Sequence, residues 1–366
     1  MVIWTATKIE KVNYCTMRFY LNYSLHKKPL LLAPYSKGIL IHEVIQDFWL
    51  KLGDPEQVRK KSSPIKYSNS EEFKSYFLSK WMQRVISSEK SDNKINWSYE
   101  EQPWVIKSQI SKLAKPLYNY LIKNGKPLFS EMPFKFSIDN KDFSGRIDEV
   151  RLIDSKVVIR DYKSGWPWME KEIAEEKPQL TLYNIGLTAI CKQDPRIARL
   201  LGLEKKVNQY LGNPIFIDDS FKHEFFMIEA LPRNSHTEDY KKEKDIPDII
   251  VPSKRTENHL LQILSMIDGT MEKISSGNIY PEKSMKCNSC DVKHACREEM
   301  KKYNSGFFED KNGQIYLSFD TPKYLEKNIP IPNNSNILKP YDLSEKPLKK
   351  KREKSNQLKL KLRKKS

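Results

Sequence analysis

Two short motifs with acidic side chains lie close together in the middle of the chain. The run 145–148 reads GRID, and the run 161–163 reads DYK. Alternate residues of a strand point to the same face, so Asp161 and Lys163 should project together, with Asp148 alongside on the preceding strand. Two carboxylates suit Mg²⁺ or Mn²⁺, and a neighbouring ammonium can steer a water or stabilise charge on a phosphate. A plain surface ion pair between Asp161 and Lys163 is the simpler interpretation of that pair alone.

Four other side chains could complete such a site. Gln179 and Tyr183 are four positions apart, so they share one face of a helix that follows the lysine. The glutamine can orient a water or a phosphate, and the tyrosine can hydrogen-bond a phosphate oxygen, although Tyr183 fits a protein core equally well. His42 offers an imidazole nitrogen as a third metal ligand, or it is a satisfied core histidine. Glu131 is a carboxylate that supports the metal ligands, or a surface residue.

A second group of residues with metal-binding chemistry lies further along the chain. Its three cysteines, spaced C-x2-C-x5-C, are Cys287, Cys290 and Cys296. A closed tetrathiolate site needs a fourth ligand, and Cys15 and Cys191 are the available ones; Cys191 has the sequence context of a core residue. Such a set holds zinc or an iron–sulfur cluster. His294 leaves open a Cys₃His zinc site without Cys15.

The elements that must position these residues follow from the hydrophobic pattern. We expect helices at 38–52, within 71–124, at 170–191 and at 255–276, and strands at 132–138, 143–153, 156–163 and 223–230. A hairpin with an Asn-Gly turn at 312–313 is expected within 306–319. Strands and helices mixed in this way predict an α/β fold with a small mixed central sheet flanked by helices.

Length and charge narrow the class of protein. The chain has 366 residues and a formal net charge of +17, from 64 Lys and Arg against 47 Asp and Glu. Nucleic acid is the first polyanionic partner to expect. The last 21 residues carry 11 Lys and Arg and one Glu, so they hold +10 of the charge and the remainder holds +7. No apolar run approaches the ~20 residues of a membrane span and no signal peptide is evident, so we expect a cytoplasmic protein, or a nuclear one in a eukaryotic host.

Taken together, these residues resemble the RecB-like branch of the PD-(D/E)XK nuclease superfamily. Within it they are most similar to the members with an iron–sulfur cluster, the AddB-type nuclease domains and the CRISPR-associated RecB-like exonucleases. The elements that match, in the family's order, are Cys15, His42, the run 145–148, the run 161–163, Gln179 with Tyr183, and the three cysteines at 287, 290 and 296. The resemblance implies a restriction-endonuclease-like core in residues 1–300.

The resemblance also implies roles for these residues. His42, Asp148, Asp161 and the backbone carbonyl of Tyr162 would bind Mg²⁺ or Mn²⁺. Lys163 would be catalytic, with support from Gln179 and Tyr183. A [4Fe–4S] cluster, with zinc as the alternative, would staple the N-terminal part of the chain to its C-terminal part; its ligands would be Cys15, Cys287, Cys290 and Cys296.

The domain organisation follows from the same comparison. Residues 1–300 would form the nuclease domain, with a helical insertion at 53–130 and the cysteine cluster at 280–300. The insertion carries Trp81, Trp97 and Trp104, which could stack on bases in a substrate-binding cap or form the core of a helical subdomain. Residues 301–340 would be an extension with a hairpin and a linker, and 341–366 a basic tail that we expect to be disordered.

The sequence therefore predicts a metal-dependent deoxyribonuclease that hydrolyses phosphodiester bonds. We expect an exonuclease that acts on single-stranded DNA or DNA ends in repair, recombination or processing. The alternatives are a non-catalytic nucleic-acid-binding module and a nuclease subunit that is active only beside a helicase partner. No G-x4-G-K-[ST] motif occurs, so no helicase motor is expected on this chain.

Overall fold

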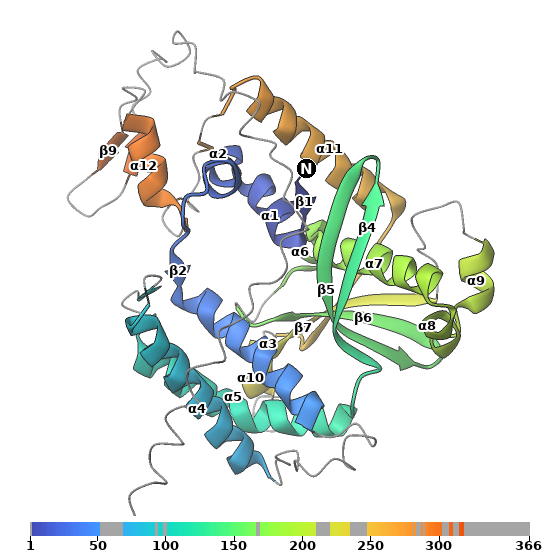
Figure 1. The fold of residues 1–366 in the computed structure, drawn as a ribbon. Helices are drawn as coiled ribbons and strands as arrows, with labels where there is room; N and C mark the ends of the chain where they lie inside the picture. Colours follow the sequence, from blue (N-terminus) through green and yellow to red (C-terminus); the bar gives the residue numbers. More distant parts are fainter. Residues whose placement is uncertain are drawn as a thin grey trace, which may run out of the picture.

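A mixed β-sheet forms the centre of the protein in the computed structural model (Figure 1). The structure describes residues 2–51, 69–91, 94–97, 101–165, 169–209, 220–234, 247–279, 281–282, 287, 290–301, 307–309 and 315–317. Within these ranges the central sheet has six strands. They are β1 (Ile3–Trp4), β4 (Phe129–Ile138), β5 (Lys141–Ile153), β6 (Lys156–Lys163), β7 (Phe221–Met227) and β8 (Ile250–Ser253).

The long strand β5 organises the sheet. It pairs along most of its length with β4, and its other edge is shared by β1 near its start and β6 near its end. The sheet then continues through β7, which is parallel to β6, to β8, which is antiparallel to β7. Two tight turns join β4 to β5 and β5 to β6, at 139–140 and 154–155, and all four turn residues have positive φ between 50° and 60°. Asp, Asn and Ser with positive φ are the residues expected in such hairpin turns.

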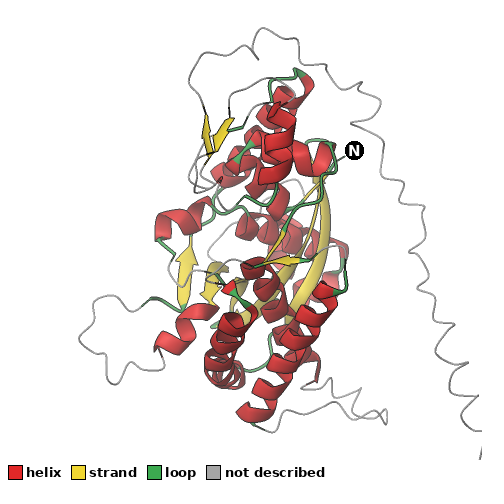
Figure 2. Ribbon diagram, turned by 90° about the vertical axis from the view of Figure 1, so that its left-hand side faces the viewer, coloured by secondary structure: helices red, strands yellow, loops and turns green. Residues whose placement is uncertain are grey.

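Helices cover the sheet on both sides, as Figure 2 shows. One hydrophobic core lies between the sheet and the elements α1 (Ala6–Tyr14), α2 (Thr16–Phe19), α7 (Gln179–Gln193) and α11 (Glu257–Ser275). Ile159 of β6 and Phe225 of β7 are two of the strand residues that face this core. The neighbouring residues Tyr162 and Phe226 face a second core, because successive side chains of a strand point to opposite faces.

The second core contains the predicted helical insertion. It is formed by α3 (Ala33–Lys51), α4 (Ser70–Glu89), α5 (Pro103–Asn124) and α10 (Leu231–Asn234). Trp81 is completely buried there and donates its Nε1 to the carbonyl oxygen of Pro103 at 3.2 Å. Trp97 packs edge-on against Trp81, with ring centroids 5.9 Å apart. Trp97 is half-buried, and Trp104 is exposed over 67% of its surface, so Trp81 is a core residue as the alternative interpretation held.

Shorter elements complete the described part of the chain. They are η1 (Tyr20–Ser24), β2 (Leu31–Leu32), β3 (Ile95–Asn96), α6 (Lys171–Glu176), α8 (Pro195–Leu200), α9 (Glu204–Gln209), η4 (Ile228–Ala230), α12 (Lys293–Lys301), β9 (Phe307–Glu309) and β10 (Ile315–Leu317). β9 and β10 pair antiparallel, as the predicted hairpin requires. The predicted turn at 312–313, the linker predicted at 321–340 and the basic tail at 341–366 lie outside the described residues.

The fold class is the one predicted, a mixed α/β architecture with helices on a central sheet. One predicted element is wrong, because the helix expected at 170–191 is two helices, α6 and α7. They separate at Lys177, which is extended with φ −71° and ψ 127°. A proline disfavours helical conformation in the residue before it, and Pro178 follows. The strand expected at 223–230 also ends early, at Met227. No helix within the described ranges is long and apolar enough to cross a membrane.

Candidate active site

Asp148 lies at the centre of the candidate site, where β5 and β6 run side by side. Its Oδ2 accepts a hydrogen bond from the backbone N–H of Tyr162 at 2.7 Å, and its Oδ1 accepts one from the Tyr183 hydroxyl at 3.2 Å. The carboxyl group is buried, and burial together with the charges of Asp161 and Glu131 raises its pKa to about 7. A buried carboxyl with this pKa gains from a nearby cation, which compensates its charge.

Glu131 reaches the site because β4 is irregular at this position. The sequence prediction started the strand at 132, whereas β4 begins at Phe129 and so includes Glu131. Glu131 has φ +53°, and the β4–β5 ladder has no pair at Glu131, although Ser130 and Met132 on either side are both paired. A glutamate in the left-handed region is strained, and such strain is often found at functional sites.

His42 comes to the same point from helix α3. Its Nδ1 lies 3.6 Å from Glu131 Oε1 and 3.6 Å from Asp148 Oδ2, while its Nε2 lies 3.2 Å from the carbonyl oxygen of Tyr162. Burial lowers the pKa of this histidine, but the charge of Asp148 and the hydrogen bond to Glu131 raise it overall, to about 9. The imidazole is therefore protonated here and supplies positive charge to an acidic cluster.

These side chains fit a divalent cation. One ligand atom from each of His42, Glu131 and Asp148 lies within 4.8 Å of the other two. The group offers two carboxylate oxygens and one imidazole nitrogen, Nδ1. The carbonyl oxygen of Tyr162 contacts the other ring nitrogen, Nε2. Hard oxygen ligands of this kind suit Mg²⁺ or Mn²⁺, and a cation would replace the proton on the imidazole.

Asp161 and Lys163 form an ion pair beside this group. The Lys163 Nζ lies 2.8 Å from Asp161 Oδ2, and the two side chains share the α7 face of β6 as the sequence predicted. Burial lowers the pKa of Lys163, but the charges of Asp161 and Glu10 raise it above its usual value, so the ammonium is protonated. Asp161 is not a member of the three-residue group, in which Glu131 supplies the second carboxylate.

Helix α7, which packs against one face of the sheet, carries Tyr183 and Gln179. Tyr183 is a core residue, and its hydroxyl donates a hydrogen bond to Asp148. Phe134 packs edge-on against its ring, with centroids 6.0 Å apart. The phenyl ring fits because Gly145 and Gly186 lack side chains: a Cβ atom would lie 2.6 Å and 2.4 Å, respectively, from ring atoms of Phe134.

Sequence reasoning missed one residue of this neighbourhood, Glu10 on α1. Its Oε1 accepts from Lys177 Nζ at 3.2 Å, and its carboxylate also interacts with Gln179 and Lys163. No local motif marks Glu10, because its partners lie more than 150 residues away and only the packing of α1 on the sheet brings them close. In the sequence, Glu10 is distinguished only by its position five residues before Cys15.

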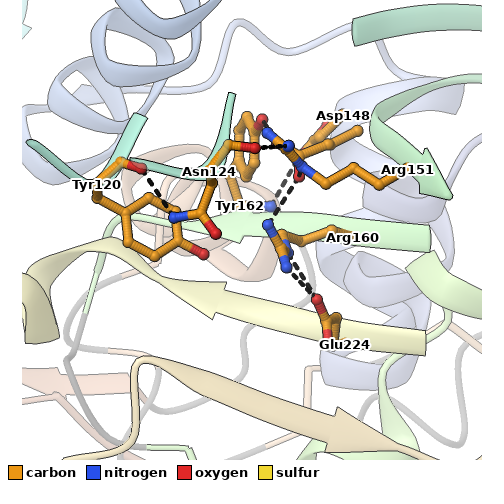
Figure 3. Close-up of polar contacts among 8 residues, drawn as sticks. Tyr120, Asn124, Asp148, Arg151, Arg160, Tyr162 and Glu224 are labelled. Atoms are coloured by element: carbon orange, nitrogen blue, oxygen red, sulfur yellow. Dashed lines mark hydrogen bonds and ion pairs between the residues drawn. The ribbon is translucent and has the colours of Figure 1, made fainter. Parts of the chain in front are cut away.

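Behind the site, a buried network of charged residues fixes the side chain of Tyr162 (Figure 3). The phenol donates to Glu149 Oε2, while Glu149 Oε1 accepts from Arg160 NH1 at 2.7 Å and from Arg151. Arg160 also binds Glu224 on β7 at 2.8 Å. The side chain of Tyr162 is thus anchored on the second face of the sheet, while its carbonyl oxygen contacts Nε2 of His42.

The cysteines also converge. The Cys15 Sγ accepts from the backbone N–H of Glu282 at 3.4 Å, and the Cys287 Sγ lies 3.7 Å from the carbonyl oxygen of the same residue. Burial, with the charges of the other three cysteines at 15, 290 and 287, raises the pKa of Cys296 to about 12. Cys191 is instead buried in the core, as expected.

Asp291 connects the loop that carries the C-terminal cysteines to the N-terminal helices. Asp291 follows Cys290 directly and binds Arg18 of α2 at 2.7 Å and Lys11 of α1 at 3.2 Å. Its backbone carbonyl also accepts from Leu30 at 2.8 Å. The N-terminal helices and the cysteine loop therefore adjoin through direct contacts of the protein.

A sequence model of the PD-(D/E)XK nuclease superfamily matches residues 3–297. The chain belongs to this superfamily. A search of curated proteins gave no significant match. The superfamily implies a metal-dependent nuclease that hydrolyses phosphodiester bonds, with DNA as the substrate. The group of His42, Glu131 and Asp148 is a site at which a PD-(D/E)XK nuclease can bind its metal.

The structure brings Asp148 and the run 161–163 together through the bond between Tyr162 N and Asp148 Oδ2. The strands that carry them are central in the sheet and are covered by helices on both sides. In this PD-(D/E)XK nuclease the site is therefore supported by rigid elements.

Proposed function

We propose that the chain is a DNA exonuclease of the RecB-like branch that acts on single strands or DNA ends. The proposal rests on one observation, made in a chain of the PD-(D/E)XK superfamily. The group of His42, Glu131 and Asp148 lies beside the ion pair of Lys163 and Asp161. The net charge of +17 supports a polyanionic substrate. The exposed indole of Trp104 could stack on an unpaired base, which favours single-stranded DNA.

The metal ligands in this proposal are His42, Glu131, Asp148 and the carbonyl oxygen of Tyr162, with Asp161 at the edge of the site. A bound Mg²⁺ or Mn²⁺ would act as a Lewis acid and offset the negative charge on the phosphate. Tyr183 holds Asp148 in place by its hydrogen bond. The network behind Tyr162 fixes the strand that presents the carbonyl.

Lys163 is the catalytic residue of this proposal. Its ammonium is oriented by Asp161 at 2.8 Å and can bind a phosphate oxygen, so that it stabilises the charge that develops during in-line attack of water. Gln179 is 7% exposed and can orient the attacking water through its carbonyl oxygen. The lysine and the glutamine therefore act on the phosphate and the water, respectively.

A nuclease assay with end-labelled DNA tests this proposal. We expect the wild type to shorten single-stranded DNA from an end when Mg²⁺ or Mn²⁺ is present and to stop when EDTA is added. Lys163→Ala should lose cleavage by at least about 100-fold. Lys156→Ala, at the other end of β6, is the matched control and should cleave as the wild type does. DNA binding without cleavage in either metal would contradict the proposal and favour a non-catalytic binding module.

If the wild type cleaves only when a DNA helicase is added, the protein is a nuclease subunit that needs a helicase partner. Internal cuts in a circular single strand would show endonuclease action and overturn the exonuclease assignment. The assay therefore separates the three functions that the sequence allowed.

We propose further that Cys15, Cys287, Cys290 and Cys296 hold a [4Fe–4S] cluster. The charges of Cys15, Cys287 and Cys290 act on Cys296, and both Cys15 and Cys287 contact Glu282, which supports a common site. Anaerobic purification should give a brown protein with four iron atoms, and Cys15→Ser should lose the iron. His294→Ala is the control, because its exposed side chain lies on α12. A colourless protein that contains zinc, and that loses it when His294 is changed, would favour the Cys₃His site.

A further inference from the structure

The hairpin of β4 and β5, two long neighbouring strands in Figure 1, has an exposed face beside the candidate active site. Phe134 and Phe143 lie on its other face, in the core that contains α7. Side chains alternate along a strand, so Lys135 and Arg146 point away from α7. Both are exposed, and so is Pro133. At these residues the face is therefore open to solvent.

Two cations on this face have no counter-charge of their own. Within the described part of the chain, neither Lys135 nor Arg146 forms an ion pair or a side-chain hydrogen bond. Asp142, which also lies on this face, accepts a hydrogen bond from Ser137 at 2.6 Å instead. The register places Arg146 opposite Pro133, two positions from Lys135, so the two cations are diagonal neighbours on adjacent strands. They form one small positive patch.

The patch leads directly to the candidate metal ligands. Arg146 is two residues from Asp148 on β5, a separation of about 7 Å along a strand. On β4, the residue opposite Arg146 is two positions from Glu131. His42 approaches from this same side of the sheet, because its ring lies 5.5 Å from that of Tyr162, whose side chain faces away from α7. A DNA strand that lay along the hairpin would therefore pass the two cations next to the metal group.

Charge complementarity indicates what this face binds. A DNA strand carries one negative charge for each phosphate, and proteins neutralise these charges with lysine and arginine. The candidate metal group contains two carboxylates, Glu131 and Asp148, so phosphates beside the cleaved bond need cations at other positions. A guanidinium can bind two oxygens of one phosphate, and an ammonium binds as a point charge. Arg146 and Lys135 supply one group of each kind.

We propose that Lys135 and Arg146 form a subsite for the DNA backbone, in which Arg146 binds the phosphate next to the cleaved bond and Lys135 the following one. The inference rests on the proposed nuclease function and adds the path of the substrate strand along the open face of the hairpin. Neither residue takes part in the chemical step. The competing explanation is ordinary solvated charge on the surface of a basic protein.

Binding of a fluorescent single-stranded oligonucleotide, without added divalent metal, tests the subsite apart from cleavage. Lys135→Ala and Arg146→Ala should each raise Kd about 3- to 10-fold. Each should also reduce the slope of log K against log salt concentration by about 0.7, the value for one phosphate contact on a single strand. Lys222→Ala, an exposed lysine on β7 of the same sheet, is the matched control and should change neither quantity.

Cleavage of the same oligonucleotide with Mg²⁺ gives a second measure. KM should rise in Lys135→Ala and Arg146→Ala while kcat stays within about 2-fold, because a contact made equally before and in the transition state affects KM alone. Salt slopes and KM values equal to those of Lys222→Ala would overturn the inference while the wild type still cleaves, and so would a loss of kcat at unchanged KM. A wild type that binds but does not cleave DNA would overturn the proposed function, and the salt slopes would still decide whether this face binds the strand.

Discussion

His42 Nε2 lies 3.2 Å from the backbone carbonyl oxygen of Tyr162, although 120 positions separate the two residues in the chain. The contact joins helix α3 of the second core to the end of strand β6. Tyr162 is fixed from behind by Glu149, so the histidine meets a carbonyl that has little freedom to move. The candidate metal site is therefore built between the helical part of the protein and the sheet.

Replacement of His42 should weaken metal binding. We expect His42→Ala to lower the affinity for Mn²⁺ about 10- to 100-fold, because it removes one of the grouped ligand atoms. Calorimetric titration with Mn²⁺ measures this without reference to cleavage. The control is His26→Asn, whose exposed side chain lies at a left-handed position that asparagine tolerates. Equal affinities in His42→Ala and the wild type would exclude His42 as a ligand.

The sequence predicted the parts of this site that depend on strand periodicity. Asp161 and Lys163 had to share a face, and Tyr162 had to face away, because side chains alternate along a strand. Asp148 was expected alongside because only a two-residue turn separates β5 from β6. The fold class followed in the same way from the order of strands and helices.

Residues that enter through tertiary packing or irregular backbone were harder to predict. Glu131 was considered as a supporting carboxylate or a surface residue, but the positive φ in β4 that brings it to His42 and Asp148 cannot be read from the sequence pattern. Glu10 depends on how α1 packs against the sheet. The split between α6 and α7 was in principle readable, because Pro178 opposes a continuous helix.

Glu149 should be important for stability rather than for binding metal. It is 2% exposed and bonds Arg151, Arg160 and Tyr162. A neutral replacement therefore leaves the buried Arg151 without its counter-charge and Arg160 with Glu224 alone. We expect Glu149→Gln to lower the free energy of unfolding by about 3 to 5 kcal/mol, measured by urea denaturation. Asp154→Asn, in the exposed β5–β6 turn, should change it by less than about 0.5 kcal/mol. A loss for Glu149→Gln as small as that control would contradict this role.

Two glycines in helices should respond oppositely to alanine. A Cβ at Gly186 of α7 would lie 2.4 Å from Phe134, so Gly186→Ala should lower the free energy of unfolding by about 1 to 3 kcal/mol through overpacking. Gly269 of α11 has no atom within 4 Å of an added Cβ. Gly269→Ala should therefore stabilise the protein by up to about 1 kcal/mol, because alanine favours helix. Stabilisation of both variants in thermal unfolding would show that Phe134 moves aside without cost.

The buried His223 should make stability depend on pH. Its Nε2 lies 3.1 Å from Asn184 Nδ2, and so accepts a hydrogen bond in the neutral form. Burial, with the charges of Arg255 and His259, lowers its pKa to about 3. Between pH 6.5 and 3 the unfolded chain binds a proton that the folded state excludes. The free energy of unfolding should therefore fall by up to about 1.4 kcal/mol per pH unit as the pH decreases through this range.

His223→Gln isolates this contribution, because glutamine can accept from Asn184 but does not titrate. Urea denaturation at several pH values between 7.5 and 4.5 gives the slope for each protein. The wild-type curve should fall more steeply below pH 6.5, and the two curves should run parallel above it. Parallel curves throughout would show that another group causes the pH dependence.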